Sequence, residues 1–207
     1  MLLADIGNTH FHIFNGETVE HLLYDDAIDK YKNRSLYYIS VKHALEDSVT
    51  KIKTWQNISD SISIDNAYDT MGVDRKALCL SYNDGMFIDA GSAITVDIME
   101  AGVYMGGYIL PGVKAMLKSY KDISSALDVE LDENISLTQL PRTTKGQISY
   151  GIIAAIKALI DKHSQKKQLY FTGGDGKFLS SFFEDAIYDE ALVFRGMIKA
   201  IKDKKIC

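Results

Sequence analysis

Two short segments of the chain place an acidic residue, a glycine and a hydroxyl residue directly after an apolar run. Asp5-Ile6-Gly7-Asn8-Thr9 follows Leu2-Leu3-Ala4, and Asp89-Ala90-Gly91-Ser92-Ala93 follows Met86-Phe87-Ile88. A glycine in such a turn admits positive φ and lets backbone N–H groups approach an anion without a Cβ in the way. The hydroxyl can donate to a phosphate oxygen, and the carboxylate can hold a cation that neutralises the phosphate. One such turn is weak evidence, because Asp-x-Gly hairpins are common. Two of them, with a later Thr172-Gly173-Gly174-Asp175 turn, predict a nucleotide-binding cleft between two related lobes.

These turns need strands on both sides, and the apolar pattern predicts the same three-strand meander twice. In the first lobe we expect strands over residues 2–6, 10–15, 18–24, 36–41 and 59–66, with helices over 42–55 and 74–81. In the second lobe we expect strands over 86–90, 94–100, 103–110 and 168–171, with helices over 113–127, 148–163, 178–183 and 192–202. The predicted fold class is therefore α/β, with one lobe over residues 1–84 and a related lobe over 85–207.

Composition narrows the class of protein. With 207 residues, 46% hydrophobic and 25% charged, the chain is typical of a globular protein with a sizeable core. The net charge of -5 gives no electrostatic footprint for nucleic acid, and no apolar run approaches the length of a membrane span. The chain starts with a motif-bearing strand rather than a signal peptide, and Cys79 and Cys207 lack metal-ligand spacing. We therefore expect a cytoplasmic protein with no nucleic-acid or membrane partner.

Several further motifs give the chain a resemblance to a known family. Gly72-Val73-Asp74-Arg75 fits a Gly-x-Asp-Arg element, and residues 106–112 fit Gly-Gly-x-Ile-x-Pro-Gly. The second glycine turn continues through Thr95 and Asp97, and Thr144 stands seven residues before Gly151. In this order the elements resemble the type III pantothenate kinases of the actin-like ATPase superfamily. The resemblance implies two lobes of ribonuclease H-like (actin-like) fold with a nucleotide cleft between them. Ser92, Thr143 and Lys76 depart from the family's usual Thr, Asn and Trp, and none of them removes a group that the chemistry requires.

The resemblance implies transfer of the ATP γ-phosphoryl group to the primary hydroxyl of pantothenate, the first step of coenzyme A biosynthesis. Catalysis of such a step is mostly positioning and charge neutralisation. The implied ATP ligands are the first turn and the strand after it, a hydroxyl of the second turn and the third glycine turn: Asp5, Ile6, Gly7, Asn8, Thr9, His10, Phe11, His12, Ser92, Thr172, Gly173 and Gly174.

A second implied group of residues binds the acceptor. Asp74 would accept the hydroxyl proton as a base, Arg75 would pair with the pantothenate carboxylate, and Gly72 would allow close backbone approach. Val73 belongs to the same element, and Tyr68 would cover the substrate. From the residues alone, Asp74 is better explained as a helix N-cap with a surface Arg partner, and Tyr68 is equally a packing residue.

Cations and a partner subunit also follow from the resemblance. Asp5 would orient Mg²⁺ through water, and Asp89 would bind a monovalent cation, K⁺ or NH₄⁺. Thr144 would reach the pantothenate site of the neighbouring subunit, which implies a homodimer with shared active sites. Taken alone, Thr144 is a helix N-cap residue, and the weaker alternative for Asp89 is a structural role in the hairpin.

Two other functions compete with this one. Another small-molecule kinase of the same fold, such as a sugar kinase, is disfavoured because a neutral sugar gives Arg75 no partner. A non-catalytic nucleotide-binding regulator is a second alternative, since the fold is widely reused. The intact Asp5, Asp74 and Asp89 weigh against it, because a decayed site usually loses its acids.

Overall fold

The computed structural model describes residues 1–7, 10–41 and 46–205, and it divides the chain into two compact units. The first unit consists of Met1–Asp84, Met99–Met105 and Glu190–Cys207, and the second of Gly85–Ile98 and Gly106–Asp189. The first unit thus takes in the tip of a hairpin and the C-terminal helix as well as the N-terminal residues. No helix in the described ranges has the length and apolar character of a membrane span.

The first unit is built on a five-stranded sheet of order β3-β2-β1-β4-β5. Its central strand β1 (Leu3–Ile6) pairs antiparallel with β2 (Phe11–Phe14) and parallel with β4 (Leu36–Ser40), and β3 (Val19–Leu22) and β5 (Trp55–Asn57) are the edges. Because side chains alternate along a strand, Ala4 and Ile6 enter one core cluster while Asp5 points to the other face. The first glycine turn, which follows β1, therefore starts at the end of the central strand of the sheet.

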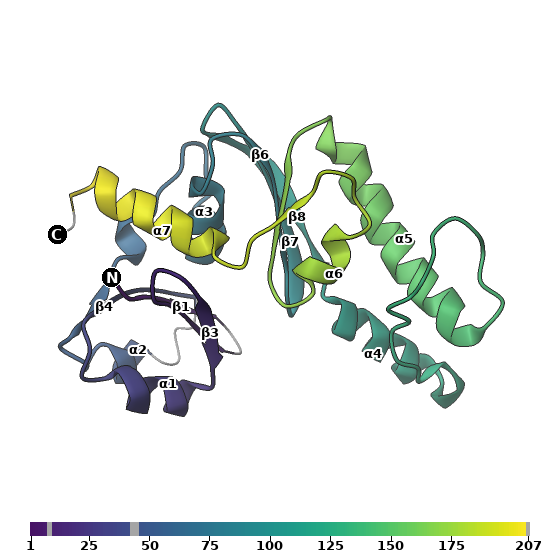
Figure 1. Ribbon diagram of the computed structural model, residues 1–207, viewed down its shortest axis with the longest axis horizontal. Helices are drawn as coiled ribbons and strands as arrows, with labels where there is room; N and C mark the ends of the chain where they lie inside the picture. The colour runs from purple at the N-terminus through teal and green to yellow at the C-terminus, as the bar shows by residue number, and fades with distance from the viewer. Residues whose placement is uncertain (8–9, 42–45, 206–207) are drawn as a thin grey trace. The chain divides into compact units, whose positions relative to one another are not determined.

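Helices cover both faces of this sheet (Figure 1). α1 (Tyr24–Tyr31) and α2 (Glu46–Val49) lie on one side, and α3 (Val73–Leu80) and α7 (Leu192–Asp203) lie together on the other. α3 and α7 approach so closely that a Cβ on Gly196 would collide with the carbonyl oxygen of Ala77. The C-terminal helix is thereby part of the core behind the first glycine turn.

Two expected elements of this unit are wrong. The helix expected over residues 42–55 is replaced by the short α2 and by β5, with residues 42–45 outside the described part of the chain. Trp55 joins the sheet instead, in register with Leu36, and its indole N–H donates to the Tyr31 carbonyl (3.1 Å). The strand expected over 59–66 is replaced by the 3₁₀ helix η2 (Ser59–Ser61), because Oδ1 of Asn57 accepts the Ser59 N–H (2.8 Å) and turns the chain.

The second unit has a sheet of order β10-β9-β6-β7-β8. Its strands β6 (Gly85–Ala90), β7 (Ala93–Glu100), β8 (Val103–Pro111) and β9 (Leu169–Thr172) confirm the predicted ones closely, and β10 (Ile187–Tyr188) is an unpredicted edge. The predicted helix over 113–127 ends at Ser124, whose extended backbone separates α4 (Val113–Ile123) from the 3₁₀ helix η3 (Ser125–Leu127). α6 (Gly176–Ser180) starts directly after the third glycine turn.

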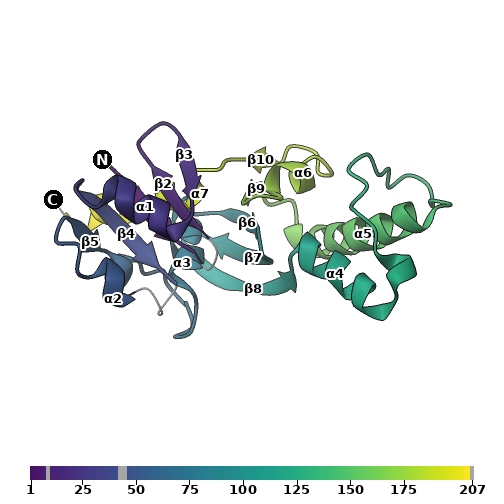
Figure 2. The same cartoon turned by 90° about the horizontal axis from the view of Figure 1, so that it is seen from below.

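The long helix α5 (Thr144–Ser164) contributes more buried residues to the core cluster of this unit than any other element does. Its buried isoleucines pack against Met86, Ile88 and Ala90 of β6, and α4 lies beside it (Figure 2). Alternation along β6 then sends Asp89 to the face opposite these helices. In both units, the acidic residue of the glycine turn therefore lies on the face of the sheet opposite the main apolar cluster.

Candidate active site

The first glycine turn is held by hydrogen bonds on two sides. The Gly7 N–H donates to the His10 carbonyl (3.1 Å), and the Tyr24 hydroxyl donates to the Gly7 carbonyl (2.7 Å). Asn8 and Thr9, which we predicted to bind phosphate, lie outside the described residues. Hydrogen bonds thus hold the turn at Gly7, which follows β1, and at His10, which precedes β2.

The other predicted phosphate ligands of this turn lie on β1 and β2. Ile6 and Phe11 are fully buried, so only their backbones are available to a ligand. Asp5 and His12 stand opposite each other in the register of the two strands, so their side chains share one face of the sheet. The strand pairing therefore brings Asp5 and His12 together beside Gly7.

The conformation of the two turn glycines differs from the expectation. Neither Gly7 nor Gly91 has φ in the left-handed region, so positive φ is not the reason for glycine at these positions. At Gly7 the nearest atom to an added Cβ is the His10 carbonyl oxygen at 3.5 Å, and at Gly91 it is the Ala93 carbonyl oxygen at 3.9 Å. The described residues leave room for a Cβ at both turns, which fits glycines that are needed for the approach of a ligand.

The second glycine turn is shorter than the first. β7 begins at Ala93, two residues after Gly91, whereas β2 begins at Phe11, four residues after Gly7. The Gly112 N–H donates to the Ser92 carbonyl (3.1 Å), so the residue before α4 holds this turn by a hydrogen bond. The Ser92 side chain remains exposed at the tip.

The third glycine turn adjoins Asp89. Asp89 and Thr172 are in register on the parallel strands β6 and β9, and Thr172 is buried. Gly173 has a φ of 84°, and a Cβ there would collide with Oδ1 of Asp89. Gly174 is exposed, and burial raises the pKa of the following Asp175. The structure thus brings Asp89, Thr172 and Gly173 together within the second unit.

The Gly-x-Asp-Arg element forms the start of α3. Gly72 is the N-cap and Val73 the first helical residue, so the interpretation of Asp74 as the N-cap is wrong. Oδ1 of Asp74 accepts the backbone N–H of Arg75 (2.8 Å) and lies where a Cβ of Gly72 would be. Glycine at position 72 is therefore required for the observed position of the Asp74 carboxylate.

Arg75 is buried, which contradicts its interpretation as a surface residue. Its side chain is only 7% exposed, and its guanidinium donates to the hydroxyls of Tyr68 (2.6 Å) and Tyr104 (3.5 Å). The guanidinium carbon also lies 5.9 Å from the centre of the Tyr68 ring. Tyr68 itself is 44% exposed, so the Arg75–Tyr68 pair joins the interior of the first unit to its surface.

Thr144 opens the long helix of the second unit. It is the first residue of α5, and the N-cap is Thr143, whose hydroxyl accepts the Gly146 N–H (3.1 Å). The capping role proposed for Thr144 from the sequence thus belongs to its neighbour. The Thr144 side chain is exposed at the end of the helix.

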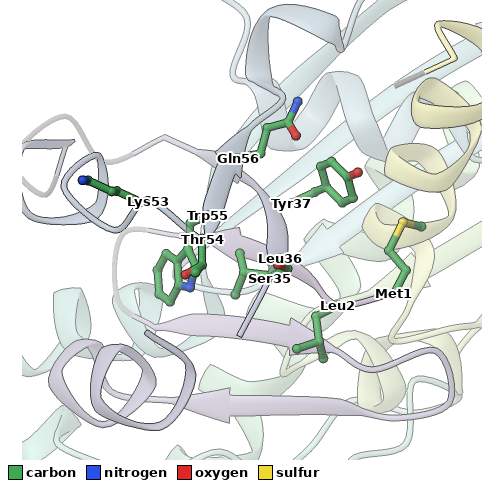
Figure 3. Close-up of a pocket in the computed structure, with 9 residues that line it drawn as sticks. All are labelled: Met1, Leu2, Ser35, Leu36, Tyr37, Lys53, Thr54, Trp55 and Gln56. Carbon is green, nitrogen blue, oxygen red and sulfur yellow. The ribbon is translucent and has the colours of Figure 1, made fainter. Parts of the chain in front are cut away.

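The first unit also has a hollow, which lies away from the predicted site residues. It is lined by residues that include Met1, Leu36, Trp55 and Gln56 (Figure 3). These residues stand where β1, β4 and β5 begin, whereas the first glycine turn follows the end of β1. The hollow contains none of the predicted site residues.

Comparison with known proteins agrees with the geometry of these elements. Residues 38–166 match the model of the type III pantothenate kinase family. The type III pantothenate kinase of Helicobacter hepaticus is 42% identical over 203 residues, which cover 98% of each chain. The chain belongs to the type III pantothenate kinase family. A second relative with this name, from Campylobacter jejuni, is 39% identical and covers 98% of this chain and 97% of its own.

Solved structures support the same family and the wider fold. A Campylobacter jejuni structure, described as a Baf family transcriptional activator, has 38% identity, full coverage of both chains and a TM-score of 0.91. MreB 5 of Spiroplasma citri, 10% identical, has a TM-score of 0.50 over 99% of this chain and 96% of its own, which supports the fold alone. This member of the family therefore has the actin-like ATPase fold predicted from its sequence.

ATP-dependent kinases of this kind use Mg²⁺, and the residues present fit a cation completed by its ligand. In the described ranges, no three His, Cys, Asp or Glu side chains gather as a ready metal site. Mg²⁺ at kinase sites is commonly held by one or two carboxylates together with phosphate oxygens and water. Asp5 beside the open Gly7 turn would supply one such carboxylate. Asp89, beside the buried Thr172, offers oxygen ligands of the kind that a hard cation prefers.

The sequence did not single out some residues that build this site. Tyr104 is the one buried residue of β8, and it reaches Arg75 from a strand far along the sequence. Tyr104 is buried while the other residues of β8 are exposed or half-buried, and this difference is visible only in the structure. Gly112, which follows β8, lies so close to the second glycine turn that a Cβ there would collide with the Gly91 carbonyl.

Proposed function

We propose that the protein transfers the γ-phosphoryl group of ATP to the primary hydroxyl of pantothenate. Membership of the type III pantothenate kinase family supports this, since curated relatives cover nearly the whole chain. The observation that carries the proposal is the start of α3, where a carboxylate and a buried guanidinium follow one glycine. These groups supply the base and the carboxylate partner that phosphorylation of pantothenate needs.

In the proposed reaction, Asp74 accepts the proton of the attacking hydroxyl. The backbone N–H of Arg75 orients the Asp74 carboxylate at the N-terminal, positive end of α3. Arg75, steadied by Tyr68 and Tyr104, pairs with the pantothenate carboxylate. A neutral sugar has no group for this guanidinium, so the buried Arg75 favours pantothenate over a sugar substrate.

The phosphates of ATP bind at the glycine turns in this proposal. The first turn and Asp5, with Mg²⁺ when it is bound, neutralise the phosphate charge, and the exposed Ser92 hydroxyl donates to a phosphate oxygen. Thr172, Gly173 and Gly174 lie by the nucleoside, and Asp89 holds K⁺ or NH₄⁺. Thr144 completes the acceptor site of a second copy, which makes the functional unit a homodimer. Use of ATP fits the cytoplasmic location predicted from the sequence.

One observation keeps a regulatory role as the second candidate. The similar Campylobacter jejuni structure carries the name of a transcriptional activator. A regulator would bind nucleotide without turnover, and the glycine turns alone do not separate the two functions. The presence of Asp74 and Arg75 favours the kinase.

The test is a coupled assay of ADP release with ATP and Mg²⁺, with and without pantothenate, in potassium and then in sodium buffer. We expect turnover that depends on pantothenate and is faster in potassium. Asp74→Asn should lower kcat by about 100-fold or more, as for loss of a general base. The control Asp69→Asn changes an exposed carboxylate of the preceding loop and should retain activity. ATP binding without turnover would favour the regulatory role, and sedimentation analysis tests the homodimer.

A further inference from the structure

Two tyrosines contact the guanidinium of Arg75, one at each of its terminal nitrogens. Nη1 donates to the Tyr68 hydroxyl (2.6 Å), and Nη2 donates to the Tyr104 hydroxyl (3.5 Å). The centres of the two tyrosine rings lie 6.3 Å apart, and the rings are tilted by 46°. Because a guanidinium is planar and rigid, contacts at both terminal nitrogens restrict the orientation of the whole group.

The two tyrosines come from different segments of the first unit. Tyr68 lies in the loop before α3, and Tyr104 lies near the start of β8. Tyr104 is buried, whereas Tyr68 is largely exposed. The orientation of Arg75 therefore depends on how this loop is attached to β8.

Two consecutive residues at the start of the loop make that attachment. Asp65 forms a parallel bridge with Val103, and its carbonyl accepts the Tyr104 N–H (3.0 Å). The side-chain amide of Asn66 donates to the Tyr104 carbonyl (2.8 Å). Both backbone polar groups of Tyr104 are thus bonded to the segment that leads to Tyr68.

The backbone conformation of Asn66 suits it to this contact. Its φ of 65° lies in the left-handed region, where asparagine is several-fold enriched among residues other than glycine. The chain turns at Asn66, directly after the bridge at Asp65, and reaches Tyr68 two residues later. Glycine adopts the same φ but has no amide, so a substitution can remove the hydrogen bond and keep the turn.

We propose that Asn66 is a positioning residue for the acceptor, because it holds Tyr104 where the tyrosine hydroxyl orients the Arg75 guanidinium toward the carboxylate of pantothenate. The inference rests on the proposed function, in which this guanidinium pairs with that carboxylate. It adds a residue outside the Gly-x-Asp-Arg element and gives it a role in specificity. Asn66 acts through Tyr104, and Tyr104 acts on the guanidinium directly.

A purely structural role for Asn66 predicts a different outcome. A less stable protein would lose activity toward every acceptor alike, whereas a displaced Arg75 guanidinium affects only acceptors that carry a carboxylate. The probe is the neutral analogue of pantothenate in which a hydroxymethyl group replaces the carboxylate. It keeps the hydroxyl that receives the phosphoryl group and gives the guanidinium no anion to bind. The ratio of kcat/KM for the two acceptors therefore measures the contribution of Arg75.

The kinetic test compares Asn66→Gly, Tyr104→Phe and the double variant with the wild type. We expect kcat/KM for pantothenate to fall about tenfold in Tyr104→Phe and about threefold or more in Asn66→Gly, as for a weakened charge-assisted hydrogen bond. The value for the neutral analogue should stay nearly unchanged in both. Because Asn66 acts through Tyr104, the double variant should fall no further than Tyr104→Phe alone.

Two further variants complete the comparison. Asn66→Asp also tolerates the left-handed φ and lacks the donor, so it should lose specificity as Asn66→Gly does. The control Asn15→Ala likewise removes hydrogen bonds between an asparagine side chain and the backbone, in the turn between β2 and β3. It should keep the wild-type ratio of the two acceptors, even if its unfolding temperature falls.

Three results would overturn the inference: unchanged kcat/KM for pantothenate in folded Asn66→Gly and Asn66→Asp, equal losses for both acceptors, or additive losses in the double variant. Calorimetry of pantothenate binding with ADP and Mg²⁺ separates the inference from the proposed function. A wild type that binds pantothenate without turnover contradicts the kinase, and the binding constants of the two acceptors in Asn66→Gly then decide the inference. A wild type that binds no pantothenate overturns both.

Discussion

Glycine is needed at some positions for ligand binding and at others for the backbone conformation, and substitutions distinguish these two roles. Gly7 has ordinary φ, and no atom of the described residues lies nearer than 3.5 Å to an added Cβ, so Gly7→Ala should fold normally. The methyl group would occupy the space proposed for a phosphate, so we expect KM for ATP to rise about tenfold or more, at least the loss of one good phosphate contact. Steady-state kinetics and thermal unfolding of the variant check both statements.

The contrasting variant is Gly173→Ala. Its φ of 84° and the collision of a Cβ with Asp89 predict a lower unfolding temperature as well as weaker nucleotide binding. A destabilised Gly7→Ala, or one with unchanged KM for ATP, would contradict the reading of Gly7 as a ligand-facing residue.

Tyr108 illustrates a buried polar atom that the fold does not use. Its hydroxyl is buried without a hydrogen-bond partner in the described part of the chain, and burial raises its pKa to about 12. Tyr108→Phe should therefore leave stability unchanged or raise it by about 1 kcal/mol. Denaturant unfolding at neutral pH measures this change.

The raised pKa of Tyr108 also predicts a pH effect. The unfolded hydroxyl ionises near pH 10 and the folded one near 12, so this residue's contribution to stability is present below pH 10 and lost as pH rises toward 12. Ultraviolet titration of Tyr108→Phe should lack one late-ionising tyrosine of the wild type. Loss of one tyrosine that ionises near pH 10, with the late ionisation unchanged, would show that Tyr108 ionises as an exposed phenol.

At the scale of elements, the contact between α3 and α7 holds the acceptor residues in place. Gly196→Ala would push a Cβ into the Ala77 carbonyl, and we expect a loss of about 1–3 kcal/mol or more in the free energy of unfolding. Because α3 begins with Val73-Asp74-Arg75, kcat should fall as well. Lys202→Ala, at an exposed position of α7, is the control and should change stability by less than about 0.5 kcal/mol. Equal stability of the two variants would contradict the close packing.

Elements with a clear apolar periodicity could be predicted from the sequence. Elements that form because of contacts with residues distant in the sequence could not. β6, β7 and β8 follow the apolar pattern and were confirmed within one residue or so of their ends. The expected helix over residues 42–55 failed because Trp55 pairs with Leu36 in the sheet, a contact invisible to local periodicity. α1 was not predicted, since a strand was expected to continue through Tyr24.

At the scale of the whole molecule, the C-terminal segment completes the first unit. α7 buries Leu192, Phe194, Met197 and Ile201, and Phe194 stacks on Phe14 of β2 with ring centres 5.3 Å apart. A chain that ends at Asp189 should therefore lose protection in β1 and β2 while α5 stays protected. Hydrogen exchange measured by mass spectrometry tests this outcome, with the full chain as the control. Protection of β1 in the shortened chain would show that the first unit folds without α7.

The sequence by itself determined the fold class, the family and most candidate site residues, because strand periodicity and glycine turns are local signals. The structure decided where those residues go. It buried Arg75 against Tyr68 and Tyr104, and it gave the N-cap of α5 to Thr143. It also joined Glu190 to His21 and His12 across the length of the chain. Such contacts depend on strand register and helix packing, which bring together residues that no local pattern relates.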